Sequence, residues 1–318
     1  MATVVLRRLV QLVGVLLVVT FLSYLLLNLV PGNTAVAILG PGATKASIAQ
    51  VTAQLHLNQP LPVRYVEWLG QLVRGNLGQS YLTHQPVAQA LGQRLPCTIE
   101  LIIMSQIIAL VVAVPLGIAA ALRPGGWLDN VASAGAFGFL SLPPYVLGYV
   151  LVLLFAVDLH LFPATGYTPL TTNVASNLHD LVLPSITLAV GSIAVYLRVL
   201  RAEMIATLQE DYITMAVAKG MPTWRILTRH AFRPSTIALV TVGCLNVGAL
   251  FGGTFLVEVV FSLPGVGSLL VESISSKDYL VVQAITVVFA VAYVLLNFLA
   301  DLAQPLLDPR LRTGSGLG

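Results

Sequence analysis

Six long apolar runs dominate the sequence and limit what the chain can fold into. They are Leu9–Val30, Leu101–Leu122, Val131–Val157, Leu181–Leu197, Ile237–Phe261 and Leu280–Leu299. A bilayer core about 30 Å thick needs roughly 20 apolar residues for each helical crossing. A strand of a membrane barrel needs only about 10 alternating residues, so every run is too long for one. The sequence therefore predicts an all-α polytopic membrane protein with six transmembrane helices.

The composition agrees with a membrane protein. Hydrophobic residues make up 57% of the 318 residues and charged residues only 9%, against about 25% charged residues in an ordinary soluble domain. The net charge of +3 is small and gives no reason to propose a nucleic-acid partner. Cys97 and Cys244 lack the spacing of a metal site or a disulfide framework, so we expect both to be structural.

The distribution of Lys and Arg predicts the orientation of the chain, because cytoplasmic flanks retain positive charge. With the N-terminus inside, 11 of the 16 basic residues fall in inner segments and 5 in outer ones. Both termini should therefore face the cytoplasm. An alternative makes the first run a cleaved signal peptide, with Arg7-Arg8 before it and Ala35-Val36-Ala37 after it. The apolar stretch Leu9–Val30 is longer than a signal core, which disfavours cleavage.

The first two runs are separated by a loop from Pro31 to about Thr98, too long for a plain connector. Within it Val63, Val66, Leu69 and Val73 recur at helical spacing, and Gly75 follows as a stop. We therefore expect an outer amphipathic helix. It would either rest on the membrane surface or help to cover the outer mouth of a pathway.

Proline and glycine interrupt several of the runs. Pro115 and Gly117 lie in the second, Pro143-Pro144 in the third and Gly252-Gly253 in the fifth. Carbonyl groups freed by proline must find partners on neighbouring helices or face a wet cavity. The interruptions suit helices packed around a pathway, although proline and glycine are also common in ordinary membrane helices.

Polar residues within the runs are few, and among them we single out Asn246, Asn297 and Glu258. Ionisable or strongly polar groups inside a membrane are functional candidates. We therefore take Asn246 and Glu258 as candidates for a translocation pathway or gate. Glu258 alternatively lies at the outer interface, where exposure to water costs little.

One polar, basic segment, Asp211–Pro234, interrupts the second half of the chain. Ile213, Ala216 and Val217 share one face of a helix over Tyr212–Lys219, and Gly220 stands where a left-handed cap is easiest. Pro222 suits the first turn of a second short helix, Pro222–His230, which should end before Pro234. Small Ala216 and Ala218 would let another backbone approach, while basic side chains would meet partner carboxylates or anionic lipid.

This segment resembles the cytoplasmic loop of binding-protein-dependent ATP-binding-cassette importers. The general motif has Glu-Ala-Ala, three residues and Gly, whereas here Thr214-Met215-Ala216 precedes Val217, Ala218, Lys219 and Gly220. The departure looks like the peptide branch of the family. Further stretches resemble the B-type membrane subunit of dipeptide and oligopeptide permeases in the same order along nearly the whole chain: "QPLPVRYVEWLGQLVRGNLGQS", "RLPCTIEL", "FSLPGVGSLL", "KDYLVVQ" and "LLDPRLR".

The resemblance implies a type I importer permease fold and a division of the chain into four parts. Residues 1–30 would form the N-terminal end and first transmembrane helix, and residues 31–98 a periplasmic loop region. Residues 99–310 would form a five-helix core with a coupling loop at 198–234, and residues 311–318 a tail. The protein would lie in the bacterial plasma (inner) membrane.

The resemblance also implies a heteromeric complex with a second permease subunit, two ATPase subunits and an extracytoplasmic binding protein. ATP and Mg would be used by the ATPases, and this chain, which lacks GxxxxGK[ST], would be neither an enzyme nor cofactor-bound. The cargo would be a dipeptide or oligopeptide, with haem or nickel as alternatives and an ion-coupled secondary transporter as a rival class. Residues implied in ATPase coupling are Asp211, Tyr212, Ala216, Ala218, Lys219, Gly220, Trp224, Arg225 and Arg229.

Overall fold

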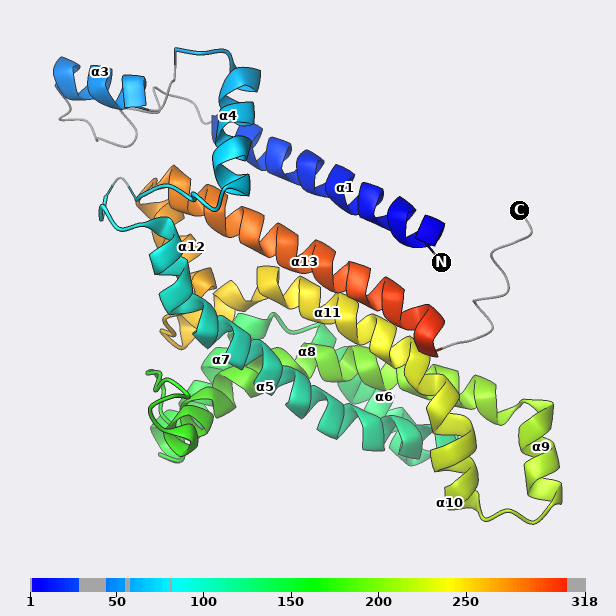
Figure 1. Cartoon of the computed structure of the whole chain (residues 1–318). Coiled ribbons are helices and arrows are strands. Elements are labelled where there is room, and N and C mark those ends of the chain that lie inside the picture. Colours follow the sequence, from blue (N-terminus) through cyan, green and yellow to red (C-terminus); the bar gives the residue numbers. More distant parts are fainter. Residues whose placement is uncertain (1, 29–43, 55–57, 81, 308–318) are drawn as a thin grey trace. The chain divides into compact units, whose positions relative to one another are not determined.

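The computed structural model describes residues 2–28, 44–54, 58–80 and 82–307 (Figure 1). Within these ranges the chain is helical, with a single isolated β-bridge between Gln79 and Pro86. The all-α fold class predicted from the sequence is confirmed. The signal-cleavage alternative at 35–37 and the predicted tail at 311–318 fall outside the described residues.

The helices fall into two compact units. The first comprises Met1–Pro96 with Pro264–Val294, and the second Cys97–Leu263 with Leu295–Gly318. Helices α5 and α13 contribute to both units. The remaining helices of the first unit are α1 (Ala2–Asn28), α3 (Lys45–Gln54), α4 (Leu61–Val73) and α12 (Val266–Ser275).

Helix α4 is the amphipathic helix that the sequence predicted in the outer loop. It ends at Val73, and Gly75 follows in the left-handed region with φ 79°. Val63, Val66 and Val73 of its predicted apolar face are exposed, and the contact of this face with a membrane surface stays a prediction. Aromatic side chains make the contact with α1 instead, and the Tyr65 hydroxyl lies 2.9 Å from Thr20 Oγ1.

A separate core of the first unit joins the start of α5 (Val87–Leu122) to α12 and α13 (Tyr279–Leu307). Arg94 on α5 pairs with Glu272 on α12 at 3.1 Å, and the Ser80 hydroxyl donates to Asp278. The core consists of Val87, Leu91, Val266, Val281, Ala284 and Ile285. Residues 87–100 are therefore helical, although the sequence placed most of them in the outer loop.

The second unit is built around α8 (Val174–Leu208), which packs against α11 (Phe232–Val260), α6 (Trp127–Leu140) and α7 (Pro144–Leu151). Gly117 of α5 lies so close to α8 that a Cβ at this position would stand 3.2 Å from Leu200 Cδ2. A methyl group here would require Leu200 to shift by a few tenths of an ångström. The other elements of this unit are η1 (Val152–Asp158), α9 (Asp211–Ala218), α10 (Thr223–Arg225) and η2 (Ile226–Ala231).

Four helices in the described ranges are long and apolar enough to cross a membrane, or five if a bent pair is one span. The bent pair is α6 with the segment Pro144–Asp158, at 102°. The third run, Val131–Val157, is therefore broken at Ser141–Pro143, next to the interruption that the sequence placed at Pro143-Pro144. Within α1, the apolar part Val10–Leu25 is shorter than the other spans. Six spans stay a prediction.

The prolines explain why the third run bends while other interrupted runs do not. Pro143 stands just before α7 and accepts backbone hydrogen bonds from Val146 (3.0 Å) and Leu147 (3.3 Å), so a new helix starts there. Pro115 and Gly252-Gly253 lie inside the continuous helices α5 and α11. Two successive prolines thus break the helix, whereas one proline does not.

Candidate functional site

The basic segment forms a helical hairpin at one end of the α8–α11 pair (Figure 1). Helix α9 starts after Glu210, whose extended backbone (ψ 146°) lets its carbonyl accept from Ile213 N at 3.0 Å. Asp211 lies in the first turn, where a carboxylate is favoured by the helix dipole. Asp211 therefore stabilises the start of this helix.

Gly220 ends α9 in the conformation that the sequence predicted. Its φ of 72° is left-handed, its N–H donates to Val217 O at 2.9 Å, and Met221 N donates to Ala216 O at 3.2 Å. These two bonds are the pair that defines a Schellman C-cap. The turn between the two arms of the hairpin is thus fixed by backbone hydrogen bonds.

A small core holds the two arms together. Ile213, Ala216 and Ile226 are buried, with Leu208 and Met221 packed against them. Ala216 therefore fills the inside of the hairpin and does not keep its outer surface low, contrary to the expectation. Val217 is also not on the buried face, since it is 60% exposed.

The second arm differs from the predicted short helix. Helix α10 begins after Pro222 but passes through the π-helical segment η2 directly into α11, without a stop before Pro234. Pro234 therefore lies inside a continuous helix, three residues after the π-helical segment η2 ends. The hairpin is therefore continuous with a predicted transmembrane helix.

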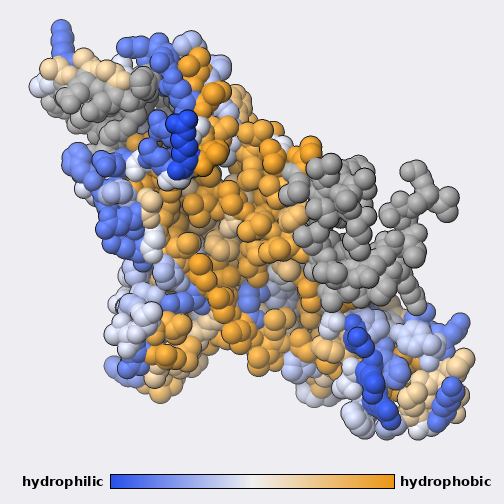
Figure 2. All heavy atoms as spheres, in the orientation of Figure 1, coloured by the Kyte–Doolittle hydropathy of each residue, from blue (hydrophilic) through white to orange (hydrophobic). Residues whose placement is uncertain are grey.

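The outer surface of the hairpin combines large apolar and basic side chains. Tyr212 (43%), Met215 (59%), Val217 (60%) and Trp224 (68%) are among the exposed large hydrophobic residues. Exposed apolar groups gathered in this way mark an interaction site. Figure 2 shows hydrophilic residues beside them at this end of the chain. We call this the tip surface; it also includes the exposed residues Asp211, Ala218, Lys219, Arg225 and Arg229.

Within the second unit, polar contacts hold the hairpin and its supporting helices in place. The Tyr212 hydroxyl donates to His230 O at 3.3 Å, across the two arms. Near the end of α8, Arg201 pairs with Asp129 of α6 through two guanidinium nitrogens, and Nη2 lies 2.7 Å from Oδ2. Asp129 Oδ2 also accepts from Gly125 N at 2.8 Å. The helix that leads into the hairpin is thus tied to the α5–α6 turn.

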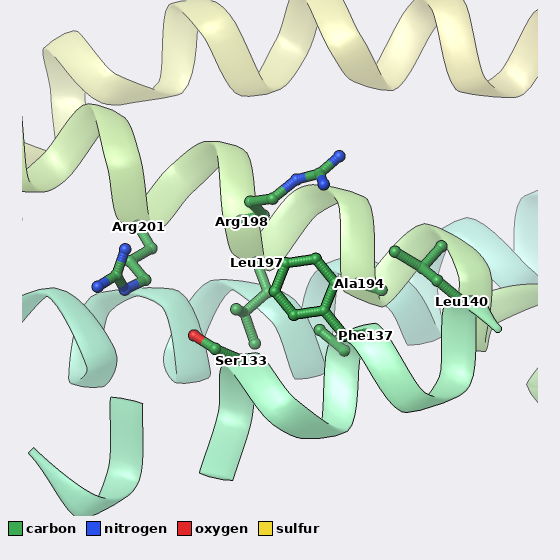
Figure 3. A pocket seen from close by; sticks show the side chains of 8 residues that line it. Ser133, Phe137, Leu140, Ala194, Leu197, Arg198 and Arg201 are labelled. Carbon is green, nitrogen blue, oxygen red and sulfur yellow. The ribbon is translucent and has the colours of Figure 1, made fainter. Parts of the chain in front are cut away.

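A pocket of about 160 Å³ lies beside this ion pair, between α6 and α8 (Figure 3). Phe137 and Leu140 of α6 face Ala194 and Leu197 of α8, so the lining is mostly apolar. Arg198 and Arg201 leave α8 in different directions in this view. The pocket holds no constellation of groups suited to catalysis.

The two pathway candidates lie in different surroundings. Glu258 is fully buried and accepts from the Thr98 hydroxyl at 2.8 Å, so its placement at an exposed interface is wrong. Asn246 is half-buried, and its Oδ1 lies 3.5 Å from Ser192 Oγ. Among the described residues, no hydrogen bond links Asn246 to Glu258, so the two candidates do not form one cluster.

Sequence reasoning missed a polar network next to Asn246. Tyr196 donates its hydroxyl proton to Gln106 Oε1, and Gln106 Nε2 lies 3.4 Å from Ser192 Oγ. The available signal was Gln106 itself, a carboxamide within the run Leu101–Leu122. The network could not be inferred further, because its members come from α5, α8 and α11.

Glu100, on α5 just before the apolar run Leu101–Leu122, organises a second missed cluster. It accepts from Asn177 Nδ2 at 2.7 Å and from the Tyr167 hydroxyl at 2.9 Å. Tyr167 lies in the loop before α8, where burial and then the Glu100 carboxylate raise the pKa of its phenol above the usual range. These contacts fasten the loop to the helices and bring no reactive pair together.

Together these features define a polytopic helical membrane protein with an exposed helical hairpin. The part of the chain that the structure describes has no group of three or more His, Cys, Asp or Glu residues able to hold a metal. Residues 113–313 match the family described as binding-protein-dependent transport system inner membrane component, and residues 1–102 match its N-terminal family. The chain belongs to this family, whose members are non-enzymatic membrane components of transporter complexes.

Curated relatives match over almost the whole chain. A probable peptide ABC transporter permease protein of Sinorhizobium fredii is 40% identical over 313 residues, covering 98% of this chain and all of the relative. The oligopeptide transport system permease protein AppB of Bacillus subtilis is 34% identical, and the glutathione transport system permease protein GsiC of Salmonella choleraesuis is 35% identical. Both of these alignments cover 98% of this chain and 99% of the relative.

Proposed function

We propose that this protein is a permease subunit of an ATP-driven importer for dipeptides or oligopeptides. It would form the pathway with a homologous second subunit, and two ATPase subunits would bind ATP and Mg. An extracytoplasmic binding protein would deliver the cargo. The names of the relatives, which refer to peptide, oligopeptide and glutathione transport, support a peptide cargo over haem or nickel.

The tip surface is the observation that carries this proposal. The exposed side chains of Trp224, Met215 and Val217 on one hairpin suit contact with a groove on a protein partner better than contact with water. The Schellman cap and the small core hold the hairpin in one shape, so that it can act as a rigid knob. The residues proposed for ATPase coupling are Asp211, Tyr212, Ala218, Lys219, Gly220, Trp224, Arg225 and Arg229, with buried Ala216 supporting them.

The proposed mechanism is alternating access. ATP can shift the equilibrium between inward-open and outward-open states only as far as it favours one of them. Because η2 continues into α11, movement of the hairpin would be carried into the membrane along a continuous helix. We further propose that Asn246 lines the pathway and that Glu258, held by Thr98, acts at a gate.

The orientation completes the proposal. The multi-pass chain would lie in the bacterial inner membrane with both termini and the hairpin in the cytoplasm, where the ATPases are. An ion-coupled secondary transporter is not favoured, since such a protein needs ionisable groups through its spans. Apolar helix surfaces that the partner subunits leave uncovered would then contact lipid.

Affinity purification of the tagged protein in mild detergent, with mass spectrometry of the chains recovered, tests the proposal. We expect a second permease and ATPases with phosphate-binding motifs. Trp224→Ala should lower the recovery of the ATPases and keep the second permease. Trp127→Ala is the matched control, because Trp127 is 75% exposed but lies on α6. Recovery of the protein alone, under conditions that keep other complexes intact, would refute the proposal.

A further inference from the structure

Two carboxamide side chains stand at the outside of a polar network within the apolar helices of the second unit. Gln106 of α5 and Asn246 of α11 are half-buried, whereas Ser192 and Tyr196 of α8 are buried behind them. Tyr196 donates to Gln106, and Ser192 lies between the two carboxamides, 3.4 Å from Gln106 Nε2 and 3.5 Å from Asn246 Oδ1. The network therefore fixes the position of both carboxamides from one side.

The carboxamides retain unused hydrogen-bonding capacity. Each has two N–H donors and an oxygen with two lone pairs. The two contacts to Ser192 are longer than the 2.7–3.2 Å of a good N–H···O bond. Asn246 Nδ2 makes no hydrogen bond to the residues that the structure describes, since the Ser192 contact is to Oδ1. Both side chains can thus accept a further partner.

That partner cannot be a hydrocarbon chain. A polar group without a hydrogen-bond partner costs on the order of several kcal/mol in the bilayer core. Gln106 lies within Leu101–Leu122 and Asn246 within Ile237–Phe261, so both are at membrane depth. The helix face that carries them must meet water or polar groups, as the wall of a translocation pathway does.

We propose that Gln106 and Asn246 bind the main-chain amides of the peptide during passage, a role that rests on the proposed function. A carboxamide offers a donor and an acceptor at amide spacing, which matches a peptide N–H and C=O. The network has no charged member, so it would read the uncharged backbone that all peptides share and not their termini. Side-chain specificity would then lie elsewhere, in the binding protein.

Uptake by the complete transporter in proteoliposomes tests this assignment. We would compare a peptide with its analogue in which one internal amide is replaced by an ester, using wild type and Asn246→Leu. Loss of one hydrogen bond of about 1 kcal/mol predicts that the ester slows wild-type uptake about 5-fold. In Asn246→Leu the peptide and the ester should be carried at nearly equal rates. The binding protein is common to both transporters, so its own preference cancels.

Gln106→Leu provides a second variant with the same expected result if Asn246→Leu is not inserted. Thr187→Val is the matched control, because the Thr187 hydroxyl bonds within its own helix, to Leu183 O at 2.8 Å. It should keep the wild-type ratio of peptide to ester uptake. If both leucine variants kept the wild-type ratio of peptide to ester uptake, with ATP-driven uptake intact, the assignment of Gln106 and Asn246 would be overturned. The proposed function would be unaffected. A wild-type complex without ATP-driven peptide uptake would overturn the proposed function as well.

Discussion

At the residue scale, Gly220 carries the sharpest prediction. Its φ of 72° suits glycine, and a Cβ there would meet nothing within 4 Å, so only backbone strain opposes substitution. Gly220→Ala should cost about 1–2 kcal/mol in the left-handed conformation. Gly220→Pro cannot adopt this φ and also removes the bond to Val217 O. We expect Gly220→Pro to abolish ATP-driven uptake while the amount of inserted protein stays normal.

Gly191→Ala is the control for this experiment, since Gly191 has free space and no left-handed φ. It should transport and insert like the wild type. Normal uptake by Gly220→Pro would show that the shape of the hairpin is not needed for coupling.

The ion pair between Asp129 and Arg201 gives a second prediction at this scale. Asp129→Ala leaves the Arg201 side chain, which is 29% exposed, without its carboxylate. Removing one partner of a fully buried pair costs 3–5 kcal/mol; partial exposure lowers our expectation to about 2 kcal/mol. Thermal unfolding in detergent measures the loss. In a cycle with Arg201→Ala, additive effects of the two substitutions would contradict direct coupling.

Single residues also show where sequence reasoning stops. The stop at Gly220 was predictable because a helix cap depends on neighbouring residues. The burial of Ala216 was not, since it depends on Ile226 from the other arm. Glu258 is a stronger case, because its partner Thr98 is 160 positions away in the chain. The candidate site was therefore found as a segment, while its inner and outer faces required the fold.

At the element scale, the hairpin should separate stability from docking. Ile213→Ala removes side-chain atoms from its small core and should loosen the hairpin by about 2 kcal/mol, near the lower limit for such substitutions. Trp224→Ala changes an exposed residue and should leave folding unaffected. Limited proteolysis of the purified protein should cut Ile213→Ala faster within 209–231 and Trp224→Ala at the wild-type rate. Equal protection of both variants would contradict the core described for the hairpin.

Helices were predictable where apolar runs specified them, and their ends were not. Helix α5 starts at Val87, well before its apolar run, because Val87 and Leu91 of its first turns pack on α12 and α13. Helix α8 continues beyond Leu197 to Leu208 for a similar reason, with Leu200 and Met204 buried in the core. The length of an apolar run depends on the thickness of the bilayer, whereas the length of a helix also depends on packing outside the bilayer.

At the scale of the whole molecule, the topology can be tested by labelling with a membrane-impermeant maleimide. Thr223→Cys in the hairpin should be labelled only after the cytoplasmic side is opened, and Thr83→Cys should be labelled in intact cells. Both positions are exposed in the structure, while the native Cys97 is buried and Cys244 is half-buried. The unsubstituted protein gives the background. Labelling of Thr223→Cys in intact cells would invert the proposed orientation.

The sharp bend between α6 and α7 has a consequence for insertion into lipid. A helix that starts afresh normally has four N–H groups without partners in its first turn. Here Pro144 has no N–H, and those of Val146 and Leu147 donate to Pro143 O. Only the Tyr145 N–H is left over, so the double proline lets the chain turn by 102° with little desolvation penalty. Replacing both prolines would add two backbone N–H donors that hydrocarbon cannot solvate. A straight helix, in which these donors are hydrogen-bonded, would then have the lower free energy.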